Sequence, residues 1–477
     1  MQRLLAILFV VTALVAGACG ASGEGDEPAE GSTESTAGDD GGGGEPADAA
    51  SFGDIEEPLC GEGEFSVDPA EAGAGTDKLY IGVLNDRSSE IRPGLNKVMY
   101  DASVAYAAWC NEQGGIGGLP IEVVDLDAAL FNVEAEMTEA CTGVFALVGG
   151  GLAQDSLEFS GKEGSDFHLC DMVDIPGYAV SIEKANSNGQ VQPIPNPGSS
   201  IPNTWVSDLE TTNPGSLETY GVLWGELPNL EIIKDKNEAA VADVSPETEI
   251  VEAQTYPVTG ASDWTPYAQK LIQSGATSFG WVGEVVNLSN FLKAVRQQGW
   301  EGTPMLEGNM YDEVLLNAGP AAEGAVIRIG FHPLEEADQW PAVQQYIDLN
   351  EQYAPGGEIG QLGMQSTSAW LLFTLAANAC GEANDGVLTR TCILEQAAEV
   401  DDWTGGGMHS PQNPARYDEV EASPCQMLLT VKDGEFVRLY PEIGGTDDDG
   451  DGFHCPEDGV TQVTGVGEGK IDPDRPI

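Results

Sequence analysis

The sequence has few basic residues. It contains 19 Lys and Arg residues against 79 Asp and Glu residues, which gives a formal net charge of −60. Such a chain does not bind nucleic acid through a basic surface, and anionic lipid repels it except through an anchor. The acidic residues extend through the whole chain, and their mutual repulsion at low ionic strength suggests, as a hypothesis, a saline habitat.

The sequence also lacks catalytic motifs. Its only histidines are His168, His332, His409 and His454, and none belongs to a nucleophile motif. There is no G-x-S-x-G, H-E-x-x-H or P-loop pattern. Pairs of carboxylates are common at this charge and therefore carry little information. We expect a protein that is not an enzyme, and a hydrolase is the weaker alternative.

In the N-terminal region, a long apolar run is found in residues 1–19 and in no other segment. That stretch has a positive start, an apolar core and small residues before Cys19, and it is shorter than a usual spanning helix of ~20 residues. It predicts a lipoprotein signal peptide with Cys19 as the lipidation site, although Ala16 stands where Leu is more usual. The alternative is an ordinary cleaved signal with an incidental cysteine. Residues 20–77 are predicted to form an acidic, Gly- and Ser-rich tether.

Eight cysteines remain once Cys19 is assigned to lipid, an even number in an oxidising compartment, which predicts up to four disulfides. Cys380 and Cys392 flank a short turn, and Cys110 and Cys141 end two successive predicted helices. We predict these two pairs. The sequence leaves three pairings open for Cys60, Cys170, Cys425 and Cys455. Buried free thiols are the alternative, and the scattered spacing disfavours a metal site.

The stretch from Asn111 to Val124, "NEQGGIGGLPIEVV", has four glycines in five positions. Before it, apolar residues recur at offsets of 3 and 4 from residue 95 to residue 109, which predicts an amphipathic helix. After it, the β-branched run predicts a strand. The glycines therefore end a helix and turn the chain back. A phosphate loop would open a helix instead.

Short apolar runs alternate with helical stretches along the chain, which predicts an α/β protein with parallel sheets. Two successive α/β halves span residues 78–190 and 191–332. A helix-rich block, 333–422, follows, and then "CQMLLTVKDGEFVRLY", a hairpin with "KDG" as its turn.

The order of "KLYIGVL", "GGIGGLPIEVV", "ACTGVFALVGGG", "LKAVRQQGW" and "LLTVKDGEFVR" resembles the branched-chain-amino-acid-type solute-binding proteins of ABC transporters, the Leu/Ile/Val-binding type. The resemblance implies two doubly wound lobes joined by three crossing strands, with a ligand cleft between them. Lobe one would be 78–190 plus 334–420, and lobe two 191–332 plus 424–441. The crossings would lie near 190–197, 331–334 and 418–424, and an acidic tail at 442–477.

In doubly wound sheets, ligands bind beyond the carboxyl ends of the strands. That rule selects five loops, at 85–94, 149–156, 176–181, 283–287 and 307–312, whose backbone N–H groups suit a carboxylate. The resemblance also assigns ligand contacts to particular positions in these loops. Ala153, Gln154 and Ala179 stand where the resemblance leads us to expect hydroxyl residues, so the usual set of contacts to an α-amino acid is incomplete. The candidate ligand-binding residues are Ser88, Ser89, Arg92, Gln154, Tyr178, Glu284, Asn309 and Tyr311. The alternative for each is a solvated loop side chain.

The tail carries a D-x-D-x-D-G pattern at residues 447–452. This spacing is typical of a calcium loop, with oxygen ligands at places 1, 3 and 5, a carbonyl at 7 and a carboxylate at 12. The predicted Ca²⁺ ligands are Asp447, Asp449, Asp451, the carbonyl of Phe453, and Asp458. A solvated acidic run is the alternative.

The predicted function is a lipid-anchored receptor on the outer face of the cell membrane. It would capture a small amino-acid-like, carboxylate or amide ligand and deliver it to an ABC permease, with no nucleic-acid partner and no catalytic cofactor. The alternative is a ligand sensor, or a calcium-stabilised surface protein without a transport role.

Overall fold

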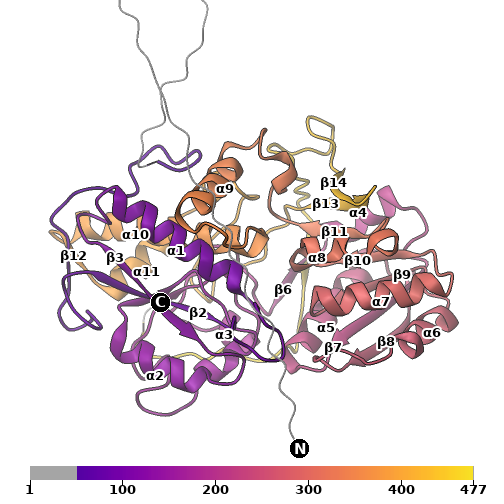
Figure 1. Cartoon of the computed structure of the whole chain (residues 1–477), viewed down its shortest axis with the longest axis horizontal. Coiled ribbons are helices and arrows are strands. Elements are labelled where there is room, and N and C mark those ends of the chain that lie inside the picture. Colours follow the sequence, from indigo (N-terminus) through magenta and orange to yellow (C-terminus); the bar gives the residue numbers. More distant parts are fainter. Residues whose placement is uncertain (1–50, 476) are drawn as a thin grey trace, which may run out of the picture. The chain divides into compact units, whose positions relative to one another are not determined.

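The computed structural model describes residues 51–475 and 477. The predicted signal peptide with Cys19 and the tether as far as residue 50 lie outside the described residues. The described part contains two large sheets, each at the centre of its own lobe (Figure 1). Among the helices described, none combines the length and apolar character needed to cross a membrane.

The first lobe is built on a parallel sheet with the strand order β3-β2-β4-β5. Its strands are β2 (Leu79–Asn85), β3 (Ile121–Asp127), β4 (Ala146–Val148) and β5 (Asp174–Ile175). Its helices are α1 (Lys97–Glu112), α2 (Val133–Gly143), α3 (Ile182–Ala185), α9 (Pro341–Tyr353), α10 (Gln361–Ala383) and α11 (Arg390–Ala398). Tyr106 of α1 donates a 2.9 Å hydrogen bond to Thr374 of α10, so the helix-rich block packs on this lobe.

The second lobe is built on a seven-stranded sheet with the order β14-β13-β11-β10-β9-β7-β8. Its parallel strands are β7 (Thr219–Gly225), β8 (Glu249–Tyr256), β9 (Ser278–Val282), β10 (Thr303–Leu306) and β11 (Val326–Ile329). Its helices are α4 (Thr204–Thr212), α5 (Pro228–Val244), α6 (Thr265–Ser274), α7 (Val285–Gln297) and α8 (Glu313–Leu316). The 3₁₀ helices of the two lobes are η1 (Asp155–Glu158), η2 (Gly308–Met310), η3 (Gly319–Ala321) and η4 (Leu334–Glu336).

The predicted hairpin is confirmed and completes the second sheet. It consists of β13 (Met427–Lys432) and β14 (Glu435–Tyr440), and β13 pairs antiparallel with β11. Its turn holds Asp433 at φ 55° and Gly434 at φ 82°. Positive φ at both central residues gives a turn whose twist matches that of the flanking strands.

The chain passes three times between the sheets. It leaves the first sheet after β5, returns after β11, and enters the second sheet again at β13. The three predicted crossings, near 190–197, 331–334 and 418–424, fall within these connections. The fold class of two α/β lobes on largely parallel sheets is therefore confirmed.

The glycine-rich stretch at 114–118 ends α1, as predicted. Gly114, Gly115, Gly117 and Gly118 all have positive φ, between 54° and 113°. The side chain of Asn111 then holds the next strand in place, because its amide accepts from the Ile121 N–H at 2.7 Å and donates to the Ile121 carbonyl at 2.8 Å. The turn has a second role that the sequence did not indicate, since the Gly117 carbonyl accepts from the N–H of Phe65 at 2.9 Å.

Residues 51–77 were predicted as the end of the tether, and that prediction is wrong. Phe52 and Leu59 are fully buried in the core, and Cys60 is bonded to Cys110 of α1. Strand β1 (Ser66–Val67) pairs with β12 (Val387–Leu388). The few apolar residues of this segment follow no period, so the sequence pattern did not reveal that they pack.

The tail also folds onto the lobes. Strand β15 (Val460–Gln462) pairs antiparallel with β6 (Ser200–Pro202). The Ile477 carbonyl accepts from the N–H of Gly189 at 2.8 Å. These contacts tie the C-terminal segment to the connections between the lobes.

Four disulfides link all eight described cysteines. The predicted Cys380–Cys392 bond is confirmed, whereas the predicted Cys110–Cys141 bond is wrong. The prediction failed because the segment that carries Cys60 was treated as tether, although it packs beside the end of α1. The bonds are Cys60–Cys110, Cys141–Cys170, Cys380–Cys392 and Cys425–Cys455.

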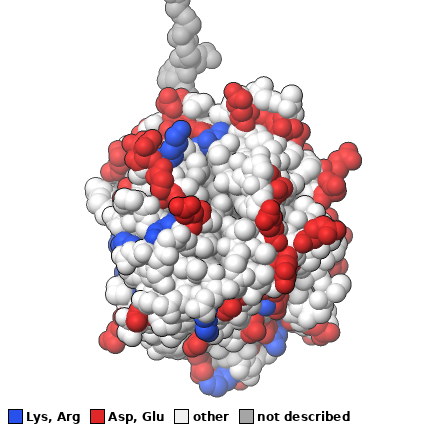
Figure 2. Space-filling view, turned by 90° about the vertical axis from the view of Figure 1, so that its right-hand side faces the viewer, with Lys and Arg blue, Asp and Glu red and all other residues white. Residues whose placement is uncertain are grey.

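The scarce basic residues are partly used inside the protein. Lys184, which is 1% exposed, pairs with Glu158 at 2.5 Å and with Asp174 at 2.8 Å. On the face drawn in Figure 2, acidic side chains are spread over the surface with few basic ones between them. This face therefore keeps the acidic character of the sequence.

Candidate functional site

A cavity of about 470 Å³ lies between the two lobes, at the carboxyl ends of their strands. All five loops predicted from the strand-end rule contribute to its lining. The sequence reasoning missed the loop after β7 and the first turns of α5, which supply Leu227, Leu230, Ile233 and Lys236. The volume lies within the usual range for small-molecule sites, ~300–1,000 Å³.

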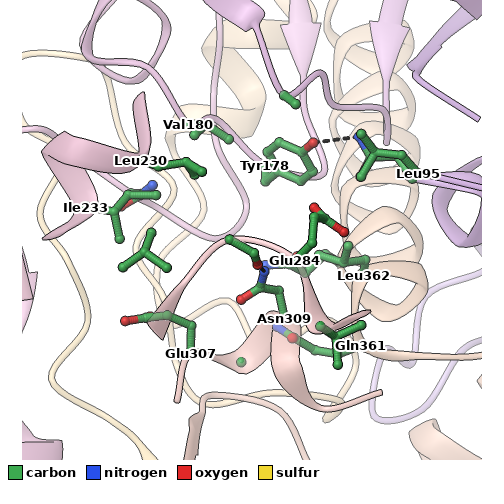
Figure 3. A pocket seen from close by; sticks show the side chains of 18 of the residues that line it. Leu95, Tyr178, Val180, Leu230, Ile233, Glu284, Glu307, Asn309, Gln361 and Leu362 are labelled. Atoms are coloured by element: carbon green, nitrogen blue, oxygen red, sulfur yellow. Dashed lines mark hydrogen bonds between the residues drawn. The ribbon is translucent and has the colours of Figure 1, made fainter. Parts of the chain in front are cut away.

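Most of the cavity wall is aliphatic. Leu230 and Ile233 project from α5, and Val180 lies across from them beside Tyr178 (Figure 3). Leu95 and Leu362 line the wall at the other end. A wall of this kind favours an apolar ligand part, and the few polar side chains fix its orientation.

Five of the eight candidate ligand-binding residues line the cavity: Arg92, Gln154, Tyr178, Glu284 and Asn309. The other three are not among its lining residues. Ser88 donates its N–H to Asp127, and the Ser89 hydroxyl accepts from the Arg92 N–H at 3.3 Å. The Tyr311 hydroxyl donates to Glu335 and accepts from the N–H of Leu334 at 2.8 Å. These three residues support the loops around the cavity, Ser88 through its backbone and Ser89 and Tyr311 through their hydroxyl groups.

Arg92 and Glu284 connect the lobes across the cavity. Arg92 follows β2 of the first lobe, Glu284 follows β9 of the second, and Nε of Arg92 donates to Oε2 of Glu284 at 2.9 Å. Each side chain is 28% exposed. The amide of Asn229 adds a second link by donating to the Ala153 carbonyl at 3.2 Å. A ligand ammonium group at Glu284 would compete with Arg92.

Tyr178 places a hydroxyl group on the first-lobe side. Its oxygen accepts a 2.6 Å hydrogen bond from Nδ2 of Asn96, which Figure 3 shows as a dashed line. Burial raises the pKa of Tyr178 well above its usual range, and the carboxylates of Asp86 and Asp155 raise it further. The hydroxyl group therefore keeps its proton and can donate it to a ligand oxygen.

Three backbone N–H groups in the loops predicted to hold a ligand carboxylate already have partners. The Ala153 N–H donates to Asp86 at 2.9 Å. The N–H groups of Val180 and Ser181 donate to Asp155 at 2.7 and 3.0 Å. Asp86 and Asp155 are 0% and 1% exposed, so these bonds lie in the interior. In the first lobe, these N–H groups thus bind the protein's own carboxylates, where the resemblance implied a carboxylate-binding cradle.

Lys236 on α5 is the functional candidate that sequence reasoning missed. It lines the cavity although the residue is only 4% exposed. Its ammonium group donates to Oδ1 of Asn196 at 3.0 Å and to the Pro197 carbonyl at 2.7 Å. The pKa of Lys236 is lowered to about 7, mainly by burial and also by nearby Arg328, while Glu307 opposes the shift.

The predicted calcium loop is held mainly by Asp448, which was not among its predicted ligands. The Asp448 carboxylate accepts from the N–H groups of Gly444, Gly450 and Gly452 at 2.7, 3.0 and 2.9 Å. Within residues 51–475 and 477, no three His, Cys, Asp or Glu side chains gather in an arrangement that would hold a metal ion. The Ca²⁺ site stays a prediction. Its predicted ligands are Asp447, Asp449, Asp451, Phe453 and Asp458.

Two lobes that hold a cavity at the carboxyl ends of their strands define a class of ligand-binding α/β proteins. Residues 234–429 match the family model described as periplasmic binding protein. No curated protein sequence matches the chain.

Several solved structures are similar over most of their length. The fatty acid ABC transporter substrate-binding protein from Thermomonospora curvata has a TM-score of 0.63 and 16% identity, over 77% of this chain and 92% of that one. The leucine binding protein LivK from Thermotoga maritima has a TM-score of 0.60 and 14% identity, over 76% and 97%. A substrate-binding periplasmic protein from Ralstonia solanacearum has a TM-score of 0.60 and 15% identity, over 76% and 100%.

The fold is that of a type I periplasmic binding protein, and residues 234–429 carry the sequence pattern of the periplasmic binding proteins. The resemblance predicted from the sequence is confirmed.

Proposed function

We propose that this protein is an extracytoplasmic solute-binding protein that captures a small ligand between its lobes and delivers it to an ABC permease. The observation that carries the proposal is the cavity, which both lobes line and the Arg92–Glu284 pair bridges. A ligand that contacts both walls binds the closed form better than an open form, and it therefore shifts the population toward closure. The closed form would be the one that docks on the permease.

The ligand is proposed to be small and amino-acid-like, or a related carboxylate or amide. Tyr178, Gln154 and Asn309 are among the residues that offer polar contacts beside the aliphatic part of the wall. The names of the similar structures include a fatty acid transporter component and a leucine binding protein. At 16% and 14% identity neither ligand carries over directly to this chain. The side chains that line the cavity of this chain must therefore determine which ligand it binds.

The place of action is proposed to be the outer face of the cell membrane, with Cys19 as the lipid-anchored residue. The support comes from the sequence of residues 1–19 and from the family of extracytoplasmic binding proteins that residues 234–429 match. Four disulfides agree with an oxidising compartment. Metabolic labelling with a radioactive fatty acid tests the anchor, and Cys19→Ala should abolish the label.

A thermal-shift screen of the purified protein in high salt tests solute binding. The library contains amino acids, amides and carboxylates, each with calcium and with chelator. A ligand at ~100 times its Kd stabilises the folded state by ~2.7 kcal/mol, which corresponds to a shift of a few degrees. We expect at least one solute to raise Tm by that amount. A shift with calcium alone, and with no solute, would contradict the proposal and favour a calcium-stabilised surface protein.

A further inference from the structure

Lys236 is a buried cation whose hydrogen-bond partners are uncharged. Both acceptors of its ammonium group, Oδ1 of Asn196 and the carbonyl of Pro197, are neutral oxygens. Among the described Lys and Arg residues that line the cavity, Arg92 pairs with Glu284 and Arg328 pairs with Glu307, whereas Lys236 forms no ion pair. An ammonium group has three donors, so one N–H of Lys236 remains for a further acceptor.

The carboxylate of Glu307, which also lines the cavity, is already engaged by other donors. Oε2 of Glu307 accepts from Nε and Nη2 of Arg328 at 2.9 and 2.6 Å. Oε1 of Glu307 accepts from Nδ2 of Asn237 at 2.6 Å. A buried charge without a counter-ion is costly, and the cost falls when an anion pairs with it. Among the described residues of the cavity wall, Lys236 is therefore the cation that lacks a counter-ion.

The backbone N–H groups of the first lobe are less available to a ligand carboxylate. Those of Ala153, Val180 and Ser181 already donate to Asp86 and Asp155. A ligand carboxylate placed there would have to displace one of these two carboxylates. Lys236, which forms no ion pair with a described residue, is thus the more favourable partner for a carboxylate.

We propose that the ammonium group of Lys236 binds the carboxylate of the ligand, and that the ligand is an aliphatic carboxylate without an ammonium group beside it. This inference rests on the proposed solute-binding function. The aliphatic chain would lie against Ile233 and Leu230, about one and two turns before Lys236 on α5, and against Val180 (Figure 3).

The absence of an α-ammonium group follows from the charges around Lys236. An α-amino acid bound here would bring its own ammonium group next to Lys236 and Arg328. The carboxylate of Glu307 already pairs with Arg328 and accepts from Asn237. A further cation brought beside Lys236 and Arg328 in a buried site is repelled by both. Removal of the α-ammonium group should therefore strengthen binding.

The test compares ligands that differ by one charged group. Isocaproate is leucine without its ammonium group, and isocaproamide is the neutral counterpart of isocaproate. Octanoate and octanamide form a second pair with a longer chain. Their affinities are measured by calorimetric titration of the wild-type protein, of Lys236→Met and of Lys270→Met. Lys270 is an exposed residue of α6 in the same lobe, so its replacement removes the same charge away from the cavity.

We expect isocaproate or octanoate to bind the wild type at least tenfold more tightly than its amide, and isocaproate to bind more tightly than leucine. Lys236→Met should remove the preference for carboxylate over amide, and Lys270→Met should keep it. If Lys236 only holds Asn196 and Pro197 in place, Lys236→Met should weaken the binding of the acid and of the amide to the same extent. Preference for leucine over isocaproate, or a carboxylate preference that survives Lys236→Met, would overturn the proposal.

The wild-type comparison keeps the test decisive even if Lys236→Met fails to fold. Equal affinity for acid and amide in the wild type is enough to refute the assignment of Lys236. Binding of some other solute, with none of these five, would refute this inference and leave the solute-binding function standing. Binding of no solute in the wider screen would refute both.

Discussion

The Arg92–Glu284 pair provides a direct test of the closed arrangement, because its two members come from different lobes. The N–O distance is 2.9 Å and each side chain is 28% exposed, so solvent screens the attraction substantially. Pairs of this kind contribute up to about 1 kcal/mol. If the pair exists only in the closed form, its loss should shift the closed-to-open ratio about fivefold toward open.

A double-mutant cycle measures the coupling. Arg92→Gln, Glu284→Gln and the double variant are compared with the wild type by equilibrium unfolding in denaturant at low salt. We expect a coupling free energy of about 0.5–1 kcal/mol that falls when salt is added. Small-angle X-ray scattering should show a larger radius of gyration for each single variant. Glu134→Gln, which breaks the exposed Lys162–Glu134 pair within one lobe, is the control. A coupling of zero, with unchanged scattering, would refute the bridging role.

Three further predictions follow from buried features. The double variant Cys60→Ser/Cys110→Ser removes a disulfide that joins residues with a sequence separation of 50. It should lower the free energy of unfolding by about 4 kcal/mol, which is measured as a lower denaturant midpoint. An unchanged midpoint would show that residues 51–77 do not pack. In the folded protein the pKa of Lys236 is lowered from 10.5 to about 7, with Arg328 and Glu307 as its charged neighbours. Between pH 7 and pH 10.5, the side chain of Lys236 therefore carries a proton in the unfolded chain and has lost it in the folded protein. Ligand-free wild type should therefore gain up to ~1.4 kcal/mol per pH unit relative to Lys236→Met as pH rises from 7 toward 10.5; parallel pH profiles would contradict this. Gly280→Ala would place a Cβ 2.0 Å from the hydroxyl of Tyr220 and should destabilise by ~1–3 kcal/mol, whereas Gly61→Ala meets no atom within 4 Å and should be nearly neutral.

The sequence predicted the architecture well because its signals are local and periodic. The apolar stripe before residue 111, the glycines at 114–118 and the "KDG" turn each determine a local conformation, and the structure has all three. The strand-end rule then located five loops of the cavity without knowledge of any side-chain position.

The errors concern long-range packing that has no local pattern. Phe52 and Leu59 are single apolar residues in a polar segment, and their burial depends on a groove formed by distant parts of the chain. The disulfide error has the same origin, because Cys60 belongs to that segment. Lys236 was missed for a different reason. It lies on a helix with Lys234 and Asp235 beside it, and only the fold shows that Lys236 faces the cavity.

The central claim is that the cavity between the lobes holds the solute, and calorimetric titration of two matched variants tests it most directly. Ile233→Asp places a charge on the cavity wall, and Ile250→Asp makes the same change at a residue of β8 that is 38% exposed. The titrants are leucine, isocaproate and octanoate. We predict that at least one binds the wild type at one site per chain, that Ile233→Asp weakens this binding at least tenfold, and that Ile250→Asp leaves it unchanged. Binding that is equally tight in Ile233→Asp would contradict the account, and so would the absence of binding by the wild type across the wider screen of amino acids, amides and carboxylates.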